Sequence, residues 1–179
     1  VKLTEAEGSK LTAPTAKPVP LLHGANGRNV PWLLKAQAQA RPNHPFIIWA
    51  PFDLPPSVIT YAEFYSRVLS LAAGLRARGV VEGDFVLLHM DNCPEFLQCW
   101  HACSQLGAVV VTTNTRSSQD ELGYFIDHCK ATVAITQPGY LQLVHRSGPD
   151  LKWIACIDHD AGAPAAPSTG RRSVPASST

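Results

Sequence analysis

The sequence lacks a strong net charge and long apolar runs. Among its 179 residues, 15 lysines and arginines are balanced by 14 aspartates and glutamates, which gives a formal net charge of +1. Nucleic-acid binding depends on clustered positive charge that meets phosphates, so this composition predicts no nucleic-acid partner. No apolar run reaches the roughly 20 residues needed to cross a bilayer, so we expect no transmembrane segment.

The sequence lacks an even set of cysteines. The five cysteines lie within segments that have helix or strand patterns, and an odd count argues against a disulfide framework. We therefore expect a reducing, cytoplasmic environment. Residues 1–10, VKLTEAEGSK, lack the apolar core of a secretory signal, which agrees with that expectation.

The common phosphate-binding and nucleophile motifs are also absent. Neither G-x-x-x-x-G-K-[ST] nor G-x-G-x-x-G occurs in the sequence, and no G-x-S-x-G elbow occurs either. The motifs therefore assign no catalytic residue to this chain.

One cysteine–histidine cluster, Cys99-x-His101-x-Cys103, has the composition of a metal site. In a helix, residues 99 and 103 share one face and residue 101 points away from it, whereas zinc needs about four converging ligands. We expect two core cysteines, a surface histidine and no bound metal. Cys93, at the start of the same helix, is either a reactive thiol with a lowered pKa or a helix cap.

Residues 84–116 are typical of a βαβ unit. Phe85–His89 is a short apolar run that predicts a buried strand. Pro94 fits the first turn of a helix whose apolar spacing continues until Gly107 ends it. Ala108–Val111 predicts a second buried strand, and two buried strands joined by one helix run parallel.

The flanking segments continue this alternation. The other expected elements are a helix over 29–40, a hairpin of 45–50 with 58–59, helices that begin after Thr60 and Ser118, a strand over 132–136, a short helix over 138–146 and a strand over 153–157. Both Thr60-x-x-Glu63 and Ser118-x-x-Glu121 are capping boxes. The sequence thus predicts a doubly wound, mostly parallel α/β sheet flanked by helices.

The two ends of the chain differ in composition from its centre. Residues 1–28 and 158–179 are rich in small and polar residues and show no sustained apolar period. We expect a mobile N-terminal lead over 1–28, one α/β domain over 29–157 and a disordered tail over 158–179.

The segment Thr112–Arg116, TTNTR, is the best candidate binding site. It follows the second strand of the βαβ unit, at the carboxyl edge where open α/β sheets bind ligands. Arginine suits bidentate phosphate binding, and the alternative is a solvated loop with Arg116 in water. His89 lies at the same predicted edge with Asp91 close behind it, and we expect His89, like the other histidines, to be structural.

The run from Ile59 to Thr136 resembles the N-terminal portion of AMP-forming acyl-CoA synthetases, in the adenylate-forming superfamily. Ile59–Phe64 matches the motif (L/I)TYxEL, and Gln105–Asn114 matches the LGAVxVPxN run. The phrase LHMDNCPEFLQCW is most similar to the crotonobetaine/carnitine–CoA ligase branch. The alternatives are another branch, such as aryl or medium-chain acyl-CoA ligases, or a non-catalytic α/β binding module.

The resemblance implies activation of a small carboxylic acid by ATP to an acyl-adenylate, then transfer to coenzyme A. ATP, Mg²⁺ and coenzyme A are the cofactors that it implies for a full-length enzyme. In a related aryl-CoA ligase, the arginine of an N-x-R segment after the second motif meets the 3′-phosphate end of coenzyme A. Asn114 and Arg116 match that segment, so both are expected to bind the cofactor.

The sequence also departs from the family pattern. It lacks the ATP loop of the form TSGTTGxPK, the adenine and ribose motifs, the hinge aspartate and the catalytic lysine. We therefore expect a fragment that is inactive alone and binds none of these cofactors tightly. We also expect association through apolar surface that the rest of the fold would cover.

Overall fold

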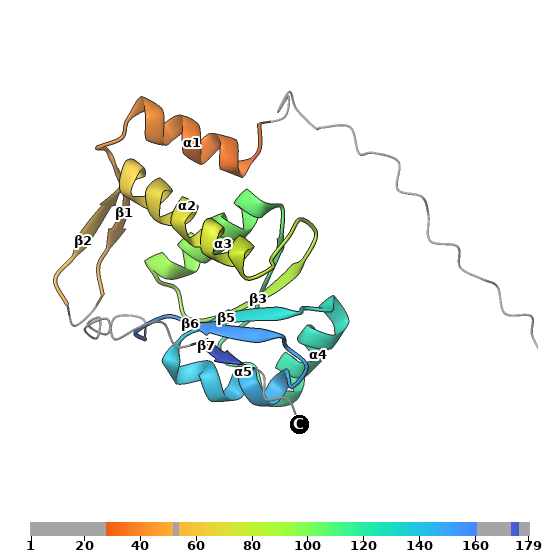
Figure 1. Cartoon of the computed structure of the whole chain (residues 1–179). Helices are drawn as coiled ribbons and strands as arrows, with labels where there is room; N and C mark the ends of the chain where they lie inside the picture. Colours follow the sequence, from red (N-terminus) through yellow and green to blue (C-terminus); the bar gives the residue numbers. More distant parts are fainter. Residues whose placement is uncertain (1–27, 52–53, 161–172, 176–179) are drawn as a thin grey trace, which may run out of the picture.

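The computed structural model describes residues 28–51, 54–160 and 173–175 (Figure 1). Its larger sheet consists of β3 (Phe85–His89), β4 (Val109–Thr112), β5 (Val133–Thr136), β6 (Trp153–Cys156) and β7 (Ser173–Pro175). The strand order is β4-β3-β5-β6-β7. The first four strands in this order are parallel to one another, and β7 is antiparallel to β6. The predicted βαβ unit is confirmed in β3 and β4.

The helices begin and end within a few residues of the predicted bounds, except that the helix expected over 138–146 is divided into a 3₁₀ helix and an α-helix that ends at Ser147. They are α1 (Val30–Ala40), α2 (Tyr61–Ala77), α3 (Pro94–Leu106), α4 (Gln119–Cys129), the 3₁₀ helix η2 (Pro138–Tyr140) and α5 (Leu141–Ser147). Both capping boxes are formed, at Thr60 with Glu63 and at Ser118 with Glu121. Gly107 ends α3 in the left-handed conformation, at φ 71°, which glycine adopts at little cost.

A separate two-stranded sheet joins α1 to α2. Strands β1 (Pro45–Trp49) and β2 (Ser57–Thr60) pair antiparallel, with Ile48 opposite Val58. The predicted hairpin is therefore confirmed, although prolines lie in and beside it. In Figure 1 the hairpin lies to one side of the larger sheet.

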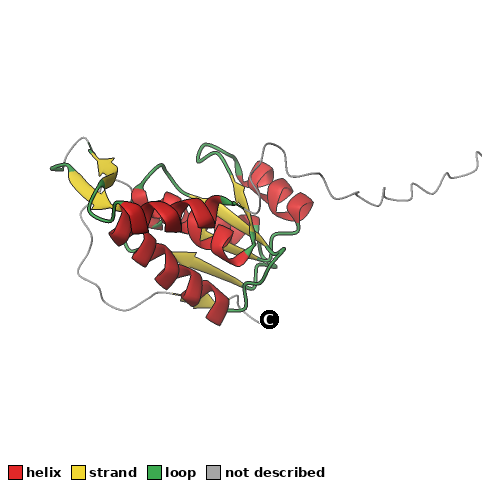
Figure 2. Ribbon diagram, turned by 90° about the horizontal axis from the view of Figure 1, so that it is seen from above, coloured by secondary structure: helices red, strands yellow, loops and turns green. Residues whose placement is uncertain are grey.

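The larger sheet lies between two layers of helices. Figure 1 shows α2 and α3 on one face of the sheet and α4 and α5 on the other, with α1 beyond α2, and Figure 2 shows helices stacked over the strands in the view from above. Side chains alternate along β3, so that Val86 and Leu88 join the first core cluster and Leu87 joins the second. The doubly wound sheet is thus confirmed. No helix in the described ranges is long and apolar enough to cross a membrane.

The ends of the chain need one correction. The expected mobile lead, 1–28, lies outside the described residues except for Arg28. The expected disorder over 158–179 is wrong at Ser173–Pro175, because these residues form β7 on the edge of β6. An open strand edge leaves backbone groups unpaired, so even a short segment gains hydrogen bonds there. Residues 161–172 and 176–179 lie outside the described ranges.

Candidate functional site

The carboxyl ends of β3 and β4 border a hollow of about 340 Å³. The residues that line it are Met90, Asp91, Asn92, Phe96, Thr112, Thr113, Asn114 and Thr115. The structure therefore brings most of the predicted segment together with Asp91, at the edge where the sequence pattern placed both. Carboxyl edges of parallel strands are where α/β sheets bind ligands, so this hollow is the candidate site.

The loop that carries Arg116 has a defined shape. The Asn114 side-chain oxygen accepts a hydrogen bond of 2.9 Å from the Arg116 N–H, which is an Asx turn. The Ser117 N–H donates to the Asn114 carbonyl oxygen at 3.0 Å. Arg116 is exposed, and no described residue hydrogen-bonds or ion-pairs with its guanidinium. That cation is therefore available to an anion from solution.

His89 is a fully buried polar residue that hydrogen-bonds this loop. It ends β3 and is 0% exposed. Its Nδ1 shares a hydrogen bond of 2.8 Å with the Thr113 hydroxyl, whereas its Nε2 is buried and has no partner in the described part of the chain. Burial lowers the pKa of His89, and the Asp91 carboxylate opposes this with a smaller increase. His89 is thus a neutral imidazole packed under the site.

Asp91 is held by residues that the sequence did not single out. Its carboxylate accepts hydrogen bonds from the Tyr140 hydroxyl at 3.1 and 3.2 Å and from Gln137 Nε2 at 3.0 Å. Its N–H donates to the Gln137 side-chain oxygen at 2.8 Å. Gln137 Nε2 also donates to Asp160 at 2.9 Å. Gln137 and Tyr140 follow β5, which is parallel to β3. Their place after a parallel strand was the sequence signal that could have put them at the same edge as Asp91.

Acidification is expected to destabilise the fold through His89. The unfolded chain takes up a proton near the ordinary histidine pKa of 6.5, whereas the folded chain resists it because burial lowers the pKa of His89. The stability from neutral His89 is therefore present above about pH 6.5 and is lost as the pH falls below it. Urea unfolding between about pH 7.5 and 5.5 should show this loss.

The variant His89→Asn should reduce that pH dependence, since asparagine does not titrate. His145→Asn, at an exposed position on α5, is the matched control and should leave the pH dependence unchanged. Equal pH dependence in the parent chain and His89→Asn would contradict the assignment.

The cysteines of α3 are structural. Cys99 and Cys103 are buried in the core, as expected. Cys93 occupies the N-cap position without a side-chain hydrogen bond to the helix, and burial raises its pKa to about 11. The hypothesis of a reactive thiol with a lowered pKa is therefore wrong, because loss of solvent outweighs the favourable helix terminus.

His101 is not the surface residue that helical spacing predicted. It is half-buried, and its ring packs edge-on against Phe64 at 5.3 Å and Trp100 at 5.2 Å. The hairpin and α2 cover the helix face that the sequence pattern had assigned to solvent. No group of three or more His, Cys, Asp or Glu side chains among the described residues could hold a metal ion.

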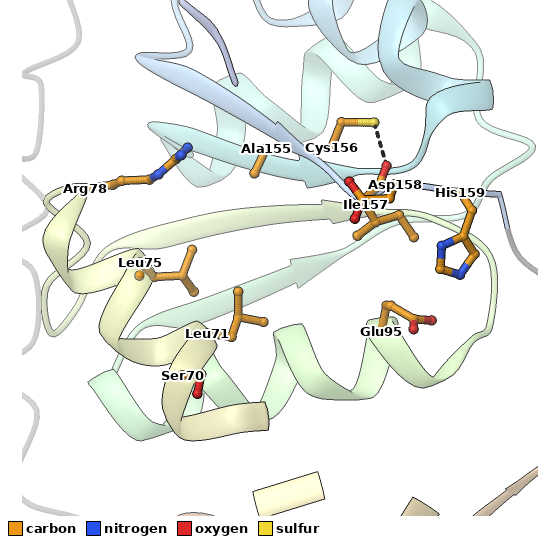
Figure 3. Close-up of a pocket in the computed structure, with 11 residues that line it drawn as sticks. Ser70, Leu71, Leu75, Arg78, Glu95, Ala155, Cys156, Ile157, Asp158 and His159 are labelled. Carbon is orange, nitrogen blue, oxygen red and sulfur yellow. Dashed lines mark hydrogen bonds between the residues drawn. The ribbon is translucent and has the colours of Figure 1, made fainter. Parts of the chain in front are cut away.

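A second hollow, of about 410 Å³, lies between α2 and the end of β6 (Figure 3). Leu71, Leu75 and Ile157 form its apolar middle, and Figure 3 shows Arg78 at one end and His159 at the other. It shares no lining residue with the hollow beside the Thr112–Arg116 loop.

Comparisons with known proteins agree with this fold. The sequence model of the family described as AMP-binding enzyme matches residues 34–177. The crotonobetaine/carnitine–CoA ligase of Proteus mirabilis is 37% identical over 90 residues, which are 48% of this chain and 17% of that protein. The corresponding ligase of Escherichia coli O1:K1 is 31% identical over 103 residues, 55% of this chain and 20% of that protein.

Solved structures show the same likeness. The inhibitor-bound N-terminal domain of FACL13 from Mycobacterium tuberculosis matches with a TM-score of 0.60 and 28% identity, over 65% of this chain and 28% of that chain. The anthranilate CoA ligase AuaEII, in complex with anthranoyl-AMP, matches with a TM-score of 0.65 over 72% of this chain and 25% of that chain. Because the two sequences are only 23% identical, this match shows a likeness of fold and nothing further.

Proposed function

The chain belongs to the AMP-binding enzyme family, and on that premise we propose that it is the N-terminal portion of an ATP-dependent acid–CoA ligase. Such an enzyme converts a carboxylic acid, ATP and coenzyme A to acyl-CoA, AMP and pyrophosphate. The matched segments span only 17–20% of the curated ligases, so the ligase activity of the whole enzyme is part of what we propose. The names of those ligases and the resemblance of the two core motifs support it.

Within this function, the proposed role of Arg116 is to bind the 3′-phosphate of coenzyme A. The observation that carries the proposal is its exposed guanidinium, without a partner among the described residues, on a loop of fixed shape beside the hollow. A guanidinium forms short, charge-assisted hydrogen bonds with phosphate oxygens. The Asn114 side chain accepts from the Arg116 N–H, so its role is to shape the loop.

The 179-residue chain by itself is proposed not to adenylate acids. The family binds ATP, Mg²⁺ and the acid through the ATP loop, the adenine and ribose motifs, the hinge aspartate and the catalytic lysine. None of these motifs occurs in this sequence. What the chain offers is one end of a coenzyme A site. Another ligase branch, such as an aryl-CoA ligase, would use the same contact, whereas a non-catalytic binding module would not discriminate the 3′-phosphate.

Coenzyme A binding tests the role of Arg116. Arg116→Ala should weaken the binding of coenzyme A roughly five- to thirtyfold, which corresponds to about 1–2 kcal/mol for a partly exposed charged contact. Binding of 3′-dephospho-coenzyme A, which lacks the phosphate in question, should be weak and unaffected by the substitution. Isothermal titration calorimetry at low ionic strength provides both affinities.

Arg146→Ala is the matched control, because Arg146 is an exposed arginine at the end of α5, outside the lining of the hollow. It should bind coenzyme A as the parent chain does. Equal affinity of the parent chain for coenzyme A and its dephospho form would contradict the proposed role of Arg116.

A further inference from the structure

A buried histidine and a half-buried tyrosine connect the Arg116 loop to the centre of the sheet. We propose that His89 and Tyr140 are positioning residues, which hold the Thr112–Arg116 loop in the shape that receives the coenzyme A phosphate. This inference rests on the proposed function for its ligand, and it assigns roles to residues that neither motif contains.

The first anchor is the hydrogen bond between His89 and Thr113. It is 2.8 Å long and joins the last residue of β3 to the first residue after β4. The Thr113 N–H also donates to the Leu88 carbonyl oxygen at 3.3 Å, which extends the ladder between the strands by one bond. Thr113, the first residue of the loop after β4, is thus held through both its backbone N–H and its side-chain hydroxyl.

The second anchor is Tyr140, which lies at the end of η2. Its ring packs edge-on against His89, with centroids 5.1 Å apart. Its hydroxyl donates to the Asp91 carboxylate at 3.1 Å. Tyr140 therefore packs against the residue that bonds Thr113, and Asp91 holds it there.

Asp91 is itself fixed, so that Tyr140 has a rigid acceptor. Gln137 is 2% exposed and bonds Asp91 through both ends of its amide. The Thr136 hydroxyl donates to the His89 carbonyl oxygen at 2.6 Å. These contacts join the carboxyl ends of β3 and β5, which pair directly in the sheet. The anchors therefore stand on two strand ends that are joined by backbone and side-chain hydrogen bonds.

A role in core packing alone does not explain why position 89 holds a histidine. Its neighbours on this face of the sheet, such as Leu87, are apolar, and its Nε2 is buried with no partner among the described residues. A buried polar atom without a hydrogen bond lowers stability, and an aliphatic side chain at this position would avoid the loss. What an aliphatic side chain cannot supply is the bond to Thr113, so the specific contribution of His89 is to the loop.

Amide exchange and ligand binding, measured on the same variants, test this inference. Thr113→Val and Tyr140→Phe each remove one hydroxyl at nearly constant volume. Each should speed hydrogen exchange of the Arg116 and Ser117 amides about fivefold, the effect of one lost hydrogen bond. Coenzyme A should bind about fivefold more weakly to each variant, with binding of the dephospho form unchanged.

Substitutions of His89 separate positioning from stability. His89→Asn places an amide near the position of Nδ1 and should keep the two amides protected, whereas His89→Leu should release them without lowering the urea midpoint. Thr132→Val, immediately before β5 and outside the loop, is the control and should change neither exchange nor affinity.

Unchanged exchange of the Arg116 and Ser117 amides in Thr113→Val and Tyr140→Phe would overturn the positioning role, whatever the ligand does. Faster exchange with unchanged coenzyme A affinity would overturn its link to the phosphate. Failure of the proposed function has a different signature: equal affinity of the parent chain and Arg116→Ala for coenzyme A.

Discussion

Leu87→Ala is expected to lower the free energy of unfolding by about 3–5 kcal/mol, which is a large part of the stability of a typical domain. Leu87 is 0% exposed and lies on β3, which pairs with β4 on one side and β5 on the other. Its side chain packs with Leu122 and Ile126 of α4. Truncation removes apolar contacts and leaves a cavity that β3, held on both sides, cannot close.

Urea unfolding followed by tryptophan fluorescence measures this effect. Leu69→Ala is the matched control, since it removes the same atoms from a side chain on α2 that is 42% exposed. It should cost less than about 1 kcal/mol, because little of that side chain is taken out of water on folding. Equal losses in the two variants would contradict the assignment of β3 to the centre of a two-layered core.

The architecture of the sheet could be predicted because the local sequence patterns and the burial of apolar residues indicate the same helices and strands. The apolar run Phe85–His89 and the capping box at Ser118 each specify one element, and the order of elements leaves few topologies. Strand β7 was not predictable. Residues 173–175 carry no strand pattern, and they pair because β6 offers an open edge, which is a tertiary effect.

The candidate site was predictable only in part. Thr112–Arg116 and Asp91 follow strands, so their position at the carboxyl edge could be inferred from the sequence. Gln137 and Tyr140 also follow a strand, but their bonds to Asp91, and that of Gln137 to Asp160, could not be predicted, because no motif connects these residues and the bonds span 23 to 49 residues. The prediction that His101 lies on the surface was wrong because helical spacing indicates which face a residue occupies but not which elements cover that face.

The expected association through apolar surface stays a prediction. Large apolar side chains that are exposed in the structure include Trp32, Leu33, Ile48, Val58 and Leu97. They belong to α1, the hairpin and α3, on the same side of the larger sheet as α2 (Figure 1). Exposed apolar surface of this kind promotes contact with other chains.

The largest expected effect is on catalysis: the purified chain should form no acyl-adenylate from any carboxylic acid and ATP. Negative charge moves between phosphate oxygens during adenylation, and it must be met by positioned amides, cations and Mg²⁺. The chain contains no phosphate loop, and no metal-binding cluster lies among the described residues. Arg116 cannot substitute for these groups, because its proposed partner is the far end of coenzyme A.

Acid-dependent exchange of radioactive pyrophosphate into ATP tests this claim most directly. The assay uses the purified chain with Mg²⁺ and a panel of acids that includes carnitine and crotonobetaine, and a full-length family member assayed in parallel is the positive control. We expect no exchange above that of the chain without acid, together with weak binding of coenzyme A that depends on Arg116. Acid-dependent exchange that is abolished by chelating Mg²⁺ would contradict the account, because these 179 residues would then carry adenylation chemistry themselves.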